Sequence, residues 1–251
     1  MSFKDQVAIV TGSGQGIGRA YALELAKEGA TVIIADLNEA RGKNVENEIR
    51  QAGQKGKFIQ VDLGSRESIL SLVDEVAKEF GRIDILVNNA AIFSTIKLKP
   101  FEEISIEEWD AVLNVNLTAM FSISQAVVPH MRKQKYGRIV NVSSSTILSG
   151  KPFYIHYVSS KAGVVGFTRA LAREVGEDNI TVNTLSPGAT ETEIERETVT
   201  KEQAELNMKT QCIKRKGEPD DLVGMVMYLV SRKASFITGQ FINVDGGKMM
   251  Y

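Results

Sequence analysis

The chain has 251 residues, of which 43% are hydrophobic, and its 30 basic and 31 acidic side chains leave a net charge of -1. This balance gives no basic surplus that would favour a nucleic acid or an anionic membrane as a partner. One cysteine and two histidines, without ligand spacing, predict neither a disulfide nor a metal site.

The sequence also lacks the marks of an exported or membrane-spanning chain. No apolar run approaches the roughly 20 residues that cross a bilayer, and the first residues show no signal-peptide pattern. We therefore expect a cytoplasmic protein without membrane contact.

Apolar runs typical of buried strands alternate with helical patterns along the whole chain. The strands are expected at residues 7–10, 32–35, 58–61, 83–87, 139–142, 180–185 and 241–244. The helices are expected at residues 16–29, 39–52, 65–80, 106–132, 154–176 and 219–230. Ser65 is placed to cap the third helix and Gly81 to end it. This order predicts an α/β fold in one domain, a doubly wound parallel sheet of the Rossmann type with a layer of helices on each face.

A glycine-rich turn follows the first strand and leads directly into a helix. It contains Gly12, Gly14, Gly16 and Gly18. Glycines allow backbone N–H groups to approach phosphate oxygens, and the positive end of the helix dipole favours a negative charge. The spacing departs from G-x-G-x-x-G, so the order of strand, turn and helix carries the prediction of a pyrophosphate site. The alternative is a flexible connecting turn.

Asp36 ends the second strand and lies 18 residues beyond Gly18. A carboxylate at this place accepts both hydroxyls of an adenosine ribose and repels a ribose 2′-phosphate. The residue therefore favours NAD over NADP. The alternative is a strand-end residue that caps the helix starting near Asn38.

Polar residues directly follow most of the predicted strands. Because ligands of an open parallel sheet bind beyond the carboxyl ends of its strands, we expect these residues to form one rim. The rim consists of Asp36, Asp62, Asn88, Asn89, Ala90, Ser143, Ser144, Ser145, Ser186, Pro187 and Gly188. Residues 190–216 are polar and interrupt the alternation, which predicts a partly helical lid over the ligand.

Four side chains near this rim are candidates for catalysis. Tyr157 and Lys161 are four residues apart in a predicted helix and so share one face. Ser144 lies 13 residues before Tyr157, and Asn116 lies on the long preceding helix. The serines on either side of Ser144 would face the opposite way if the strand continued.

With these residues the sequence resembles the short-chain dehydrogenases/reductases over essentially its whole length. The motifs that carry the resemblance are Thr11-Gly12-x-x-x-Gly16-x-Gly18, Asn88-Asn89-Ala90, Ser144, Tyr157-x-x-x-Lys161, Pro187-Gly188, Thr238-Gly239-Gln240 and Val244-Asp245-Gly246-Gly247. One departure is Ala91, where the family has glycine. Its methyl group would strain the site only if a positive φ were required.

The resemblance implies hydride transfer between NAD(H) and a secondary alcohol or ketone, with Tyr157 as general acid/base. Ser144 would orient the substrate oxygen, and Lys161 would hold the nicotinamide ribose and make the phenol more acidic. Asn116 would support a water in a proton relay. The implied cofactor contacts are Gly12, Gln15, Gly16, Ile17, Gly18, Asp36, Asp62, Leu63, Asn89, Ala90, Tyr157, Lys161, Pro187, Gly188, Thr190 and Thr192.

Some of these contacts have an ordinary alternative. Asp62 would meet the adenine amino group and Asn88 would stabilise the sheet beside the cofactor, but both residue types are also common in turns.

The expected substrate pocket is mostly apolar and has no arginine placed for an anion, which favours a neutral substrate. Its lining residues are Ile92, Phe93, Thr146, Leu148, Phe153, Tyr154 and Ala189. The stretches after Ser144 and before Tyr157 are also similar to those of family members that oxidise aryl secondary alcohols.

Two other functions remain open. A 3-oxoacyl-[acyl-carrier-protein] reductase would use NADPH, would need a basic docking patch and usually has arginine at the position of Gln15. A non-enzymatic regulatory protein on the same fold would lack a catalytic residue. The long helices at 106–132 and 154–176, which pair between subunits in the family, predict a homotetramer.

Overall fold

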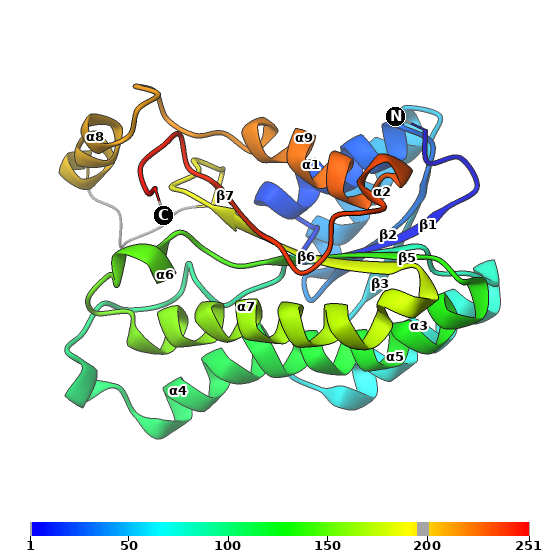
Figure 1. Cartoon of the computed structure of the whole chain (residues 1–251), viewed down its shortest axis with the longest axis horizontal. Helices are drawn as coiled ribbons and strands as arrows, with labels where there is room; N and C mark the ends of the chain where they lie inside the picture. The colour runs from blue at the N-terminus through cyan, green and yellow to red at the C-terminus, as the bar shows by residue number, and fades with distance from the viewer. Residues whose placement is uncertain (1, 195–200, 251) are drawn as a thin grey trace.

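The computed structural model describes residues 2–194 and 201–250 and shows a three-layer α/β fold (Figure 1). The strands of the described chain form one seven-stranded sheet in the order β3-β2-β1-β4-β5-β6-β7, and every neighbouring pair is parallel. They are β1 (Val7–Thr11), β2 (Thr31–Asp36), β3 (Lys55–Gln60), β4 (Ile85–Asn88), β5 (Gly137–Val142), β6 (Ile180–Pro187) and β7 (Phe241–Val244). The direction of the connections reverses between β1 and β4, which is where such sheets bind ligands.

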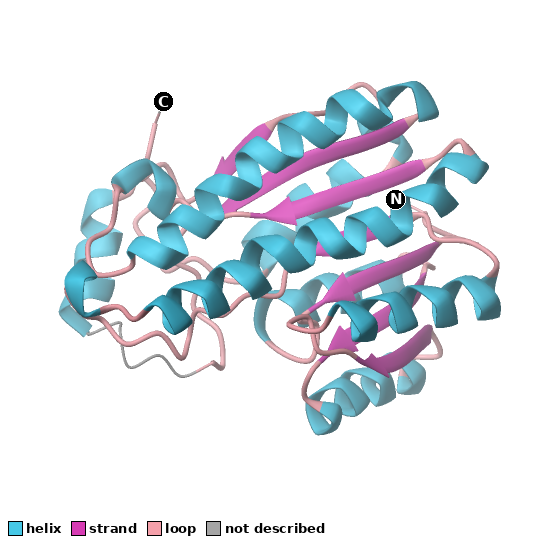
Figure 2. Cartoon of the chain, turned by 90° about the horizontal axis from the view of Figure 1, so that it is seen from below, coloured by secondary structure: helices cyan, strands magenta, loops and turns pink. Residues whose placement is uncertain are grey.

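Helices cover both faces of the sheet (Figure 2). One face carries α1 (Gly16–Lys27), α2 (Glu39–Gln51) and α9 (Asp220–Val230), and the other carries α3 (Arg66–Phe80), α5 (Ala119–Gln134) and α7 (Ile155–Val175). The shorter elements are η1 (Phe101–Glu103), α4 (Ile106–Leu113), the π-helical turn η2 (Asn114–Thr118), α6 (Thr146–Ser149), η3 (Gly176–Asp178), α8 (Lys201–Thr210) and η4 (Arg232–Ala234). The predicted doubly wound fold is confirmed.

The core consists of two layers of aliphatic side chains, one on each face of the sheet. Strands β1, β4, β5 and β6 are buried along their whole length, because helices cover them from both sides. This is why β1 and β4 are apolar almost throughout and show no alternation, whereas β5 and β6 also bury polar residues. Each fully buried Val or Ile contributes about 1.5–3 kcal/mol.

Local signals fix most of the helix ends. The Asn38 side chain accepts from Arg41 N–H at the start of α2, and Ser65 Oγ accepts from Ser68 N–H at the start of α3. Gly81 ends α3 with a φ of +71°, as predicted. Strand β3 begins at Lys55 rather than 58, because it is the edge strand and its polar first half does not need to be buried.

The segment Ile106–Gln134 is one continuous helix that includes α4, the π-helical turn and α5. It is the one helix of the described chain that is long and apolar enough to span a bilayer by length and composition, and half of its most apolar window is buried inside the fold. The expectation that no apolar stretch approaches this length was therefore wrong. Polar residues such as Asn116 and Ser124 interrupt the apolar run in the sequence but not the helix.

A row of buried polar side chains crosses β4, β5 and β6. Asn88 on β4 donates to Asn141 on β5 (2.9 Å), and Asn141 donates to Thr168 on α7 (2.9 Å). Thr184 on β6 also donates to Thr168 (2.9 Å). Because each group has a partner, the row is stable in the interior and fixes α7 on the sheet.

Candidate active site

The glycine turn adopts a conformation that side chains would prevent. Gly12 and Gly16 have φ values of +62° and +58°, which L-residues rarely adopt. A Cβ on Gly18 would lie 2.2 Å from the carbonyl oxygen of Gly12, and a Cβ on Gly14 would lie 2.9 Å from the carboxylate of Asp36. The turn is thus a cradle of bare backbone at the N-terminus of α1.

Asp36 is the last residue of β2 and faces this cradle. Its carboxylate accepts from the N–H groups of Gly14 (2.8 Å) and Asn38 (2.9 Å). The alternative reading as a helix cap does not hold, since the side chain of Asn38 caps α2. The sequence analysis missed Arg41, whose Cβ lies 3.1 Å from the position of a Cβ on Gly14.

The N-terminus of α1 binds an anion in this structure. The N–H of Gly16 donates to the carboxylate of Glu193 (2.8 Å), whose oxygen stands where a phosphate oxygen would accept. Thr192, a predicted cofactor contact, precedes Glu193, and its hydroxyl accepts from Ile194 N–H (3.3 Å). Gln15 and Ile17 flank Gly16 in the same turn.

The segment after β6 is held by the carboxyl end of β7. Gly188 N–H donates to Val244 (2.9 Å), and a Cβ on Gly188 would lie 2.5 Å from Cβ of Asp245. Pro187 is the last residue of β6, and Thr190 donates to the carbonyl of Gly188 (3.2 Å). The predicted cofactor contacts of this segment, Pro187, Gly188, Thr190 and Thr192, therefore extend from the end of β6 to the glycine turn.

The Asn-Asn-Ala motif joins the ends of β1 and β4. The hydroxyl of Thr11 accepts from the N–H groups of Asn89 (3.0 Å) and Ala90 (3.1 Å), and the side chain of Asn89 donates to the carbonyls of Thr11 (3.0 Å) and Gly12 (3.2 Å). Ala91 is not among the described non-glycine residues with positive φ, so its methyl group causes no backbone strain. The motif forms the floor beside the glycine turn.

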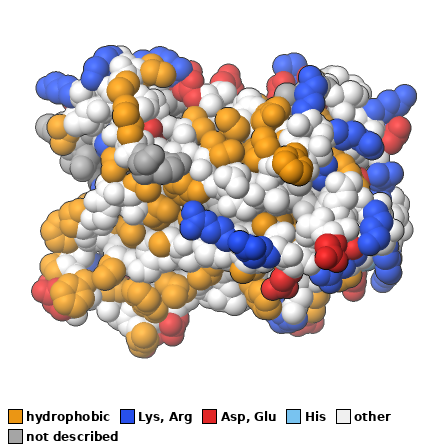
Figure 3. Space-filling view, in the orientation of Figure 1, with side chains coloured by type: hydrophobic (Ala, Val, Ile, Leu, Met, Phe, Trp, Pro, Cys, Tyr) orange, Lys and Arg blue, Asp and Glu red, His pale blue; other side chains and the backbone are white. Residues whose placement is uncertain are grey.

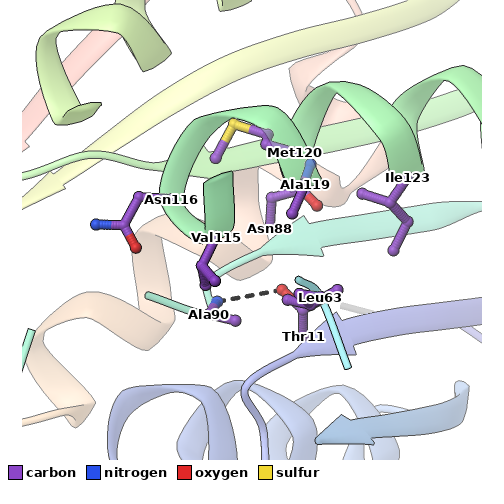
Figure 4. Close-up of a pocket in the computed structure, with 9 residues that line it drawn as sticks. All are labelled: Thr11, Leu63, Asn88, Ala90, Val115, Asn116, Ala119, Met120 and Ile123. Atoms are coloured by element: carbon purple, nitrogen blue, oxygen red, sulfur yellow. Dashed lines mark hydrogen bonds between the residues drawn. The ribbon is translucent and has the colours of Figure 1, made fainter. Parts of the chain in front are cut away.

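A small cavity of about 10 Å³ lies next to this floor. Figure 4 shows it between Thr11 at the end of β1 and Val115 on the π-helical turn, with Leu63 also in its lining. Asp62 is exposed, and its carboxylate accepts from Gly64 N–H (2.8 Å). Leu63 thus lines the cavity, and Asp62 makes the turn that was its alternative role. Contact of these two residues with the cofactor stays a prediction.

The side chain of Asn116 holds the backbone of Ile92 and the hydroxyl of Ser160. Its oxygen accepts from Ile92 N–H (2.8 Å), and its amide nitrogen donates to the carbonyl of Ile92 (3.2 Å) and to the hydroxyl of Ser160 (3.2 Å). Ser160, which the sequence analysis missed, donates to the carbonyl of Tyr157 (2.7 Å). With both amide hydrogens used, a relay water at Asn116 would have to donate its own hydrogen, either to the second lone pair of Oδ1 or to a backbone carbonyl.

Tyr157 and Lys161 lie on the same face of α7, as their spacing predicts. Both are buried, with exposed fractions of 6% and 2%. The Nζ of Lys161 lies 5.9 Å from the centre of the Tyr157 ring and donates to the carbonyl of Val142 (2.8 Å). Burial without an acidic partner lowers the pKa of Lys161 to about 8.

Ser144 is buried directly beyond the end of β5. Its oxygen accepts from the hydroxyl (2.9 Å) and the N–H (3.3 Å) of Thr146, which leaves its own O–H to donate to a substrate oxygen. Ser143 instead donates to the carbonyl of Lys161 (2.7 Å). The preference for Ser144 over Ser143 therefore agrees with the geometry, although the strand ends at Val142 and strand alternation is not the reason.

Aromatic rings surround the phenol. The ring centre of Phe93 lies 4.7 Å from that of Tyr157 and 5.9 Å from that of Tyr154. The hydroxyl of Tyr154 is buried and has no hydrogen-bond partner in the described chain. Phe153, expected in the pocket, is half exposed. The surroundings of Tyr157 are therefore apolar and aromatic.

The low pKa of Lys161 gives a prediction about stability. Between the folded pKa of about 8 and the ordinary value of 10.5, the unfolded chain holds a proton on this lysine that the folded chain has lost. The free energy of unfolding of the cofactor-free protein should therefore rise with pH by up to about 1.4 kcal/mol per unit between these two values, and should change little through this group below about pH 7.

Urea denaturation at pH 8 and at about pH 9.5 measures this effect, and groups of the unfolded chain that also ionise there, such as tyrosines, contribute equally to a variant that lacks only the lysine. The matched variant is Lys161→Met, which keeps the apolar stem and has no proton to lose. An equal pH slope in both proteins would contradict the prediction.

Taken together, the carboxyl ends of β1, β2, β4, β5 and β6 present two sets of groups. One set fits a dinucleotide: an anion-binding helix N-terminus, a bare glycine turn and a carboxylate at the end of β2. The other set, Ser144, Tyr157 and Lys161, can bind a substrate oxygen and move a proton to or from it.

Comparison with known proteins agrees with this arrangement. Residues 12–248 match a family model described as "Enoyl-(Acyl carrier protein) reductase". The chain is 39% identical over 250 residues to 3-oxoacyl-[acyl-carrier-protein] reductase FabG of Thermotoga maritima, with 98% of this chain and 99% of the relative covered. It is 38% identical over 251 residues to (2S)-[(R)-hydroxy(phenyl)methyl]succinyl-CoA dehydrogenase subunit BbsD of Thauera aromatica, with 100% and 99% covered. The crystal structure of levodione reductase superposes with a TM-score of 0.92 at 30% identity and covers 98% of both chains.

Proposed function

The chain belongs to the short-chain dehydrogenase/reductase family of oxidoreductases, which act on CH–OH groups with a nicotinamide cofactor, and from this premise we propose that it transfers a hydride between NAD(H) and a neutral secondary alcohol or ketone. The observation that carries the proposal is the placement of Tyr157, Lys161 and Ser144 at the same sheet edge as the glycine turn and Asp36. The cofactor, when bound, supplies or accepts the hydride.

The residues of the chain handle the proton and the substrate oxygen. Ser144 donates its free O–H to that oxygen, and Tyr157 takes the hydroxyl proton during oxidation or returns it during reduction. The ammonium of Lys161 stabilises the phenolate, and it is available in protonated form below its pKa of about 8. Asn116 and Ser160 hold the backbone of Ile92 and Tyr157 in place.

Asp36 supports NAD as the cofactor, and its replacement tests this. In Asp36→Ser the charge that repels a 2′-phosphate is gone, and Arg41 beside Gly14 can attract that phosphate. We expect the ratio of kcat/KM for NAD+ to that for NADP+ to fall by about 100-fold, which corresponds to about 2.7 kcal/mol.

The matched control is Glu39→Ser, because Glu39 is exposed on the first turn of α2 and pairs with Lys43. Initial rates with both cofactors give the ratio for each protein. A wild-type enzyme that prefers NADPH would overturn the choice of NAD.

A neutral substrate is supported by the aromatic surroundings of Tyr157. Two relatives are named for substrates other than a 3-oxoacyl chain. BbsD is a [(R)-hydroxy(phenyl)methyl]succinyl-CoA dehydrogenase, whose name contains an aryl secondary alcohol on a charged succinyl-CoA, and the solved relative is a levodione reductase. We propose that aryl secondary alcohols are among the substrates.

Reduction of a 3-oxoacyl thioester is the second candidate, and the FabG relatives favour it. A screen that follows NADH and NADPH absorbance with ketones, secondary alcohols and a 3-oxoacyl thioester separates the two. Turnover of the thioester with NADPH alone would replace our proposal by this candidate.

A homotetramer stays a prediction. It is supported by large apolar side chains that remain exposed, among them Ile106 at the start of α4 and Phe121 on α5. Figure 3 shows hydrophobic side chains grouped at the end of the molecule where α4 and α6 lie.

A further inference from the structure

The segment that follows β6 places a negative charge inside the cofactor cradle. Although Glu193 is exposed, its carboxylate accepts the hydrogen bond of Gly16 N–H (2.8 Å). The next residue packs on the same turn, since Cδ1 of Ile194 lies 2.8 Å from the position of a Cβ on Gly16. A glycine with φ of +58° at the start of a helix thus presents its N–H to an anion that the chain itself provides.

Two cations favour this contact. Arg19, in the first turn of α1, and Arg41, in the first turn of α2, both attract the carboxylate. Partial burial acts to raise the pKa of Glu193, but the Gly16 N–H bond and the two arginines outweigh it and keep the pKa below its usual value. Glu193 is therefore negatively charged at neutral pH.

We propose that Glu193 is a built-in competitor for the diphosphate of the cofactor and so weakens cofactor binding to the free enzyme. The inference rests on the proposed binding of a nicotinamide dinucleotide at the glycine turn. One N–H cannot donate fully to two anions, and the two negative charges repel each other at this distance. The cofactor must therefore displace Glu193, and its apparent dissociation constant is the intrinsic one divided by the fraction of molecules in which Gly16 is free.

The same competition acts on release. When the diphosphate begins to leave, Glu193 can return to Gly16 N–H, so the contact favours dissociation as well as opposing association. Occupation of Gly16 N–H in the free enzyme lowers the apparent association rate by the fraction of molecules in which this group is free, and the return of Glu193 raises the dissociation rate.

Equilibrium binding to the full chain tests the proposal with Glu193→Gln, which keeps the size of the side chain and removes its charge. The probes are NAD+, ADP and adenosine, measured by calorimetry. We expect the dissociation constants of NAD+ and ADP to fall about five-fold, a change of about 1 kcal/mol, because the contact is exposed and screened. The dissociation constant of adenosine, which has no phosphate, should stay within a factor of two.

The matched control is Glu191→Gln. Glu191 lies two residues earlier in the same segment, but it pairs with Lys216 and not with the glycine turn. All three ligands should bind this variant as they bind the wild type. Glu193→Ala provides a second variant without the carboxylate, and thermal unfolding of each free protein checks that it folds.

Unchanged or weaker ADP binding in Glu193→Gln and Glu193→Ala would overturn the proposal. A gain for adenosine as large as that for ADP would also overturn it, since it would show a general opening of the site. If the proposed function is wrong but the role of Glu193 is right, the result is different: ADP would still bind the variant more tightly than the wild type, and no alcohol or ketone would be turned over.

Discussion

Replacement of Tyr157 by phenylalanine is expected to lower kcat by about 10²- to 10⁴-fold, the usual contribution of a positioned general acid or base. The variant keeps the ring that packs 4.7 Å from Phe93 and loses only the hydroxyl. Without it, the substrate oxygen has no group that can exchange its proton inside the pocket. The dissociation constant of NAD+ should change by less than about three-fold, because the ring and Lys161 remain.

Tyr21→Phe is the matched control for the loss of one buried phenol oxygen. Tyr21 is fully buried on α1, and its hydroxyl has no hydrogen-bond partner in the described chain. Its loss should leave kcat unchanged and should not lower stability, since no hydrogen bond is broken. Steady-state rates of both variants with one substrate provide the comparison. If Tyr157→Phe keeps a tenth or more of the wild-type turnover, Tyr157 is not the acid/base.

Replacement of Gly18 by alanine is expected to cost both stability and cofactor binding. The new Cβ would lie 2.2 Å from the carbonyl oxygen of Gly12 and 2.5 Å from the amide nitrogen of Asn89. Neither distance is possible, so the turn must move away from the Asn89 side chain that ties it to β4. We expect a loss of about 3 kcal/mol in the free energy of unfolding, as for severe overpacking. A turn displaced by about 1 Å should also lower kcat/KM for NAD+ by about 100-fold.

Gly224→Ala is the corresponding change at a helical glycine with open space. A Cβ at Gly224 in α9 would meet no atom within 4 Å. Alanine in a helix should therefore stabilise this variant by about 0.5–1 kcal/mol. Urea denaturation and NAD+ titration of the two variants measure the contrast. Equal behaviour of Gly18→Ala and Gly224→Ala would contradict the close approach at Gly18.

The sequence was most informative where local chemistry alone decides the structure. Apolar runs rich in valine and isoleucine indicated β1, β2 and β4, because strands covered on both faces tend to have that composition. The glycine turn and the spacing of Tyr157 and Lys161 were predicted on the same basis. Gly12 and Gly16 do need positive φ, and the two side chains do share a face.

Features that depend on contacts distant in the sequence were missed or assigned another use. Asn116 was predicted to support a relay water, which stays a prediction, and its hydrogen bonds to the backbone of Ile92, which a π-helical turn brings close, were not foreseen. Ser160 gives no signal of its own, since a serine in a helix is ordinary until its partners are known. The contact of Glu193 with Gly16 spans 177 residues and could not be read from either neighbourhood.

The polar row of Asn88, Asn141 and Thr184 has a consequence for how the strands align. Parallel strands of interchangeable valines and isoleucines define their register poorly, since a slip of two residues would still bury aliphatic groups. In the native register these three residues are direct neighbours, and a slip would strand an amide or hydroxyl in the interior at a cost of about 1–3 kcal/mol each. The row therefore sets the alignment of β4, β5 and β6. Because Asn88 ends β4 directly before Asn89 of the floor, the same row also fixes how far along the sheet these strands carry their site residues.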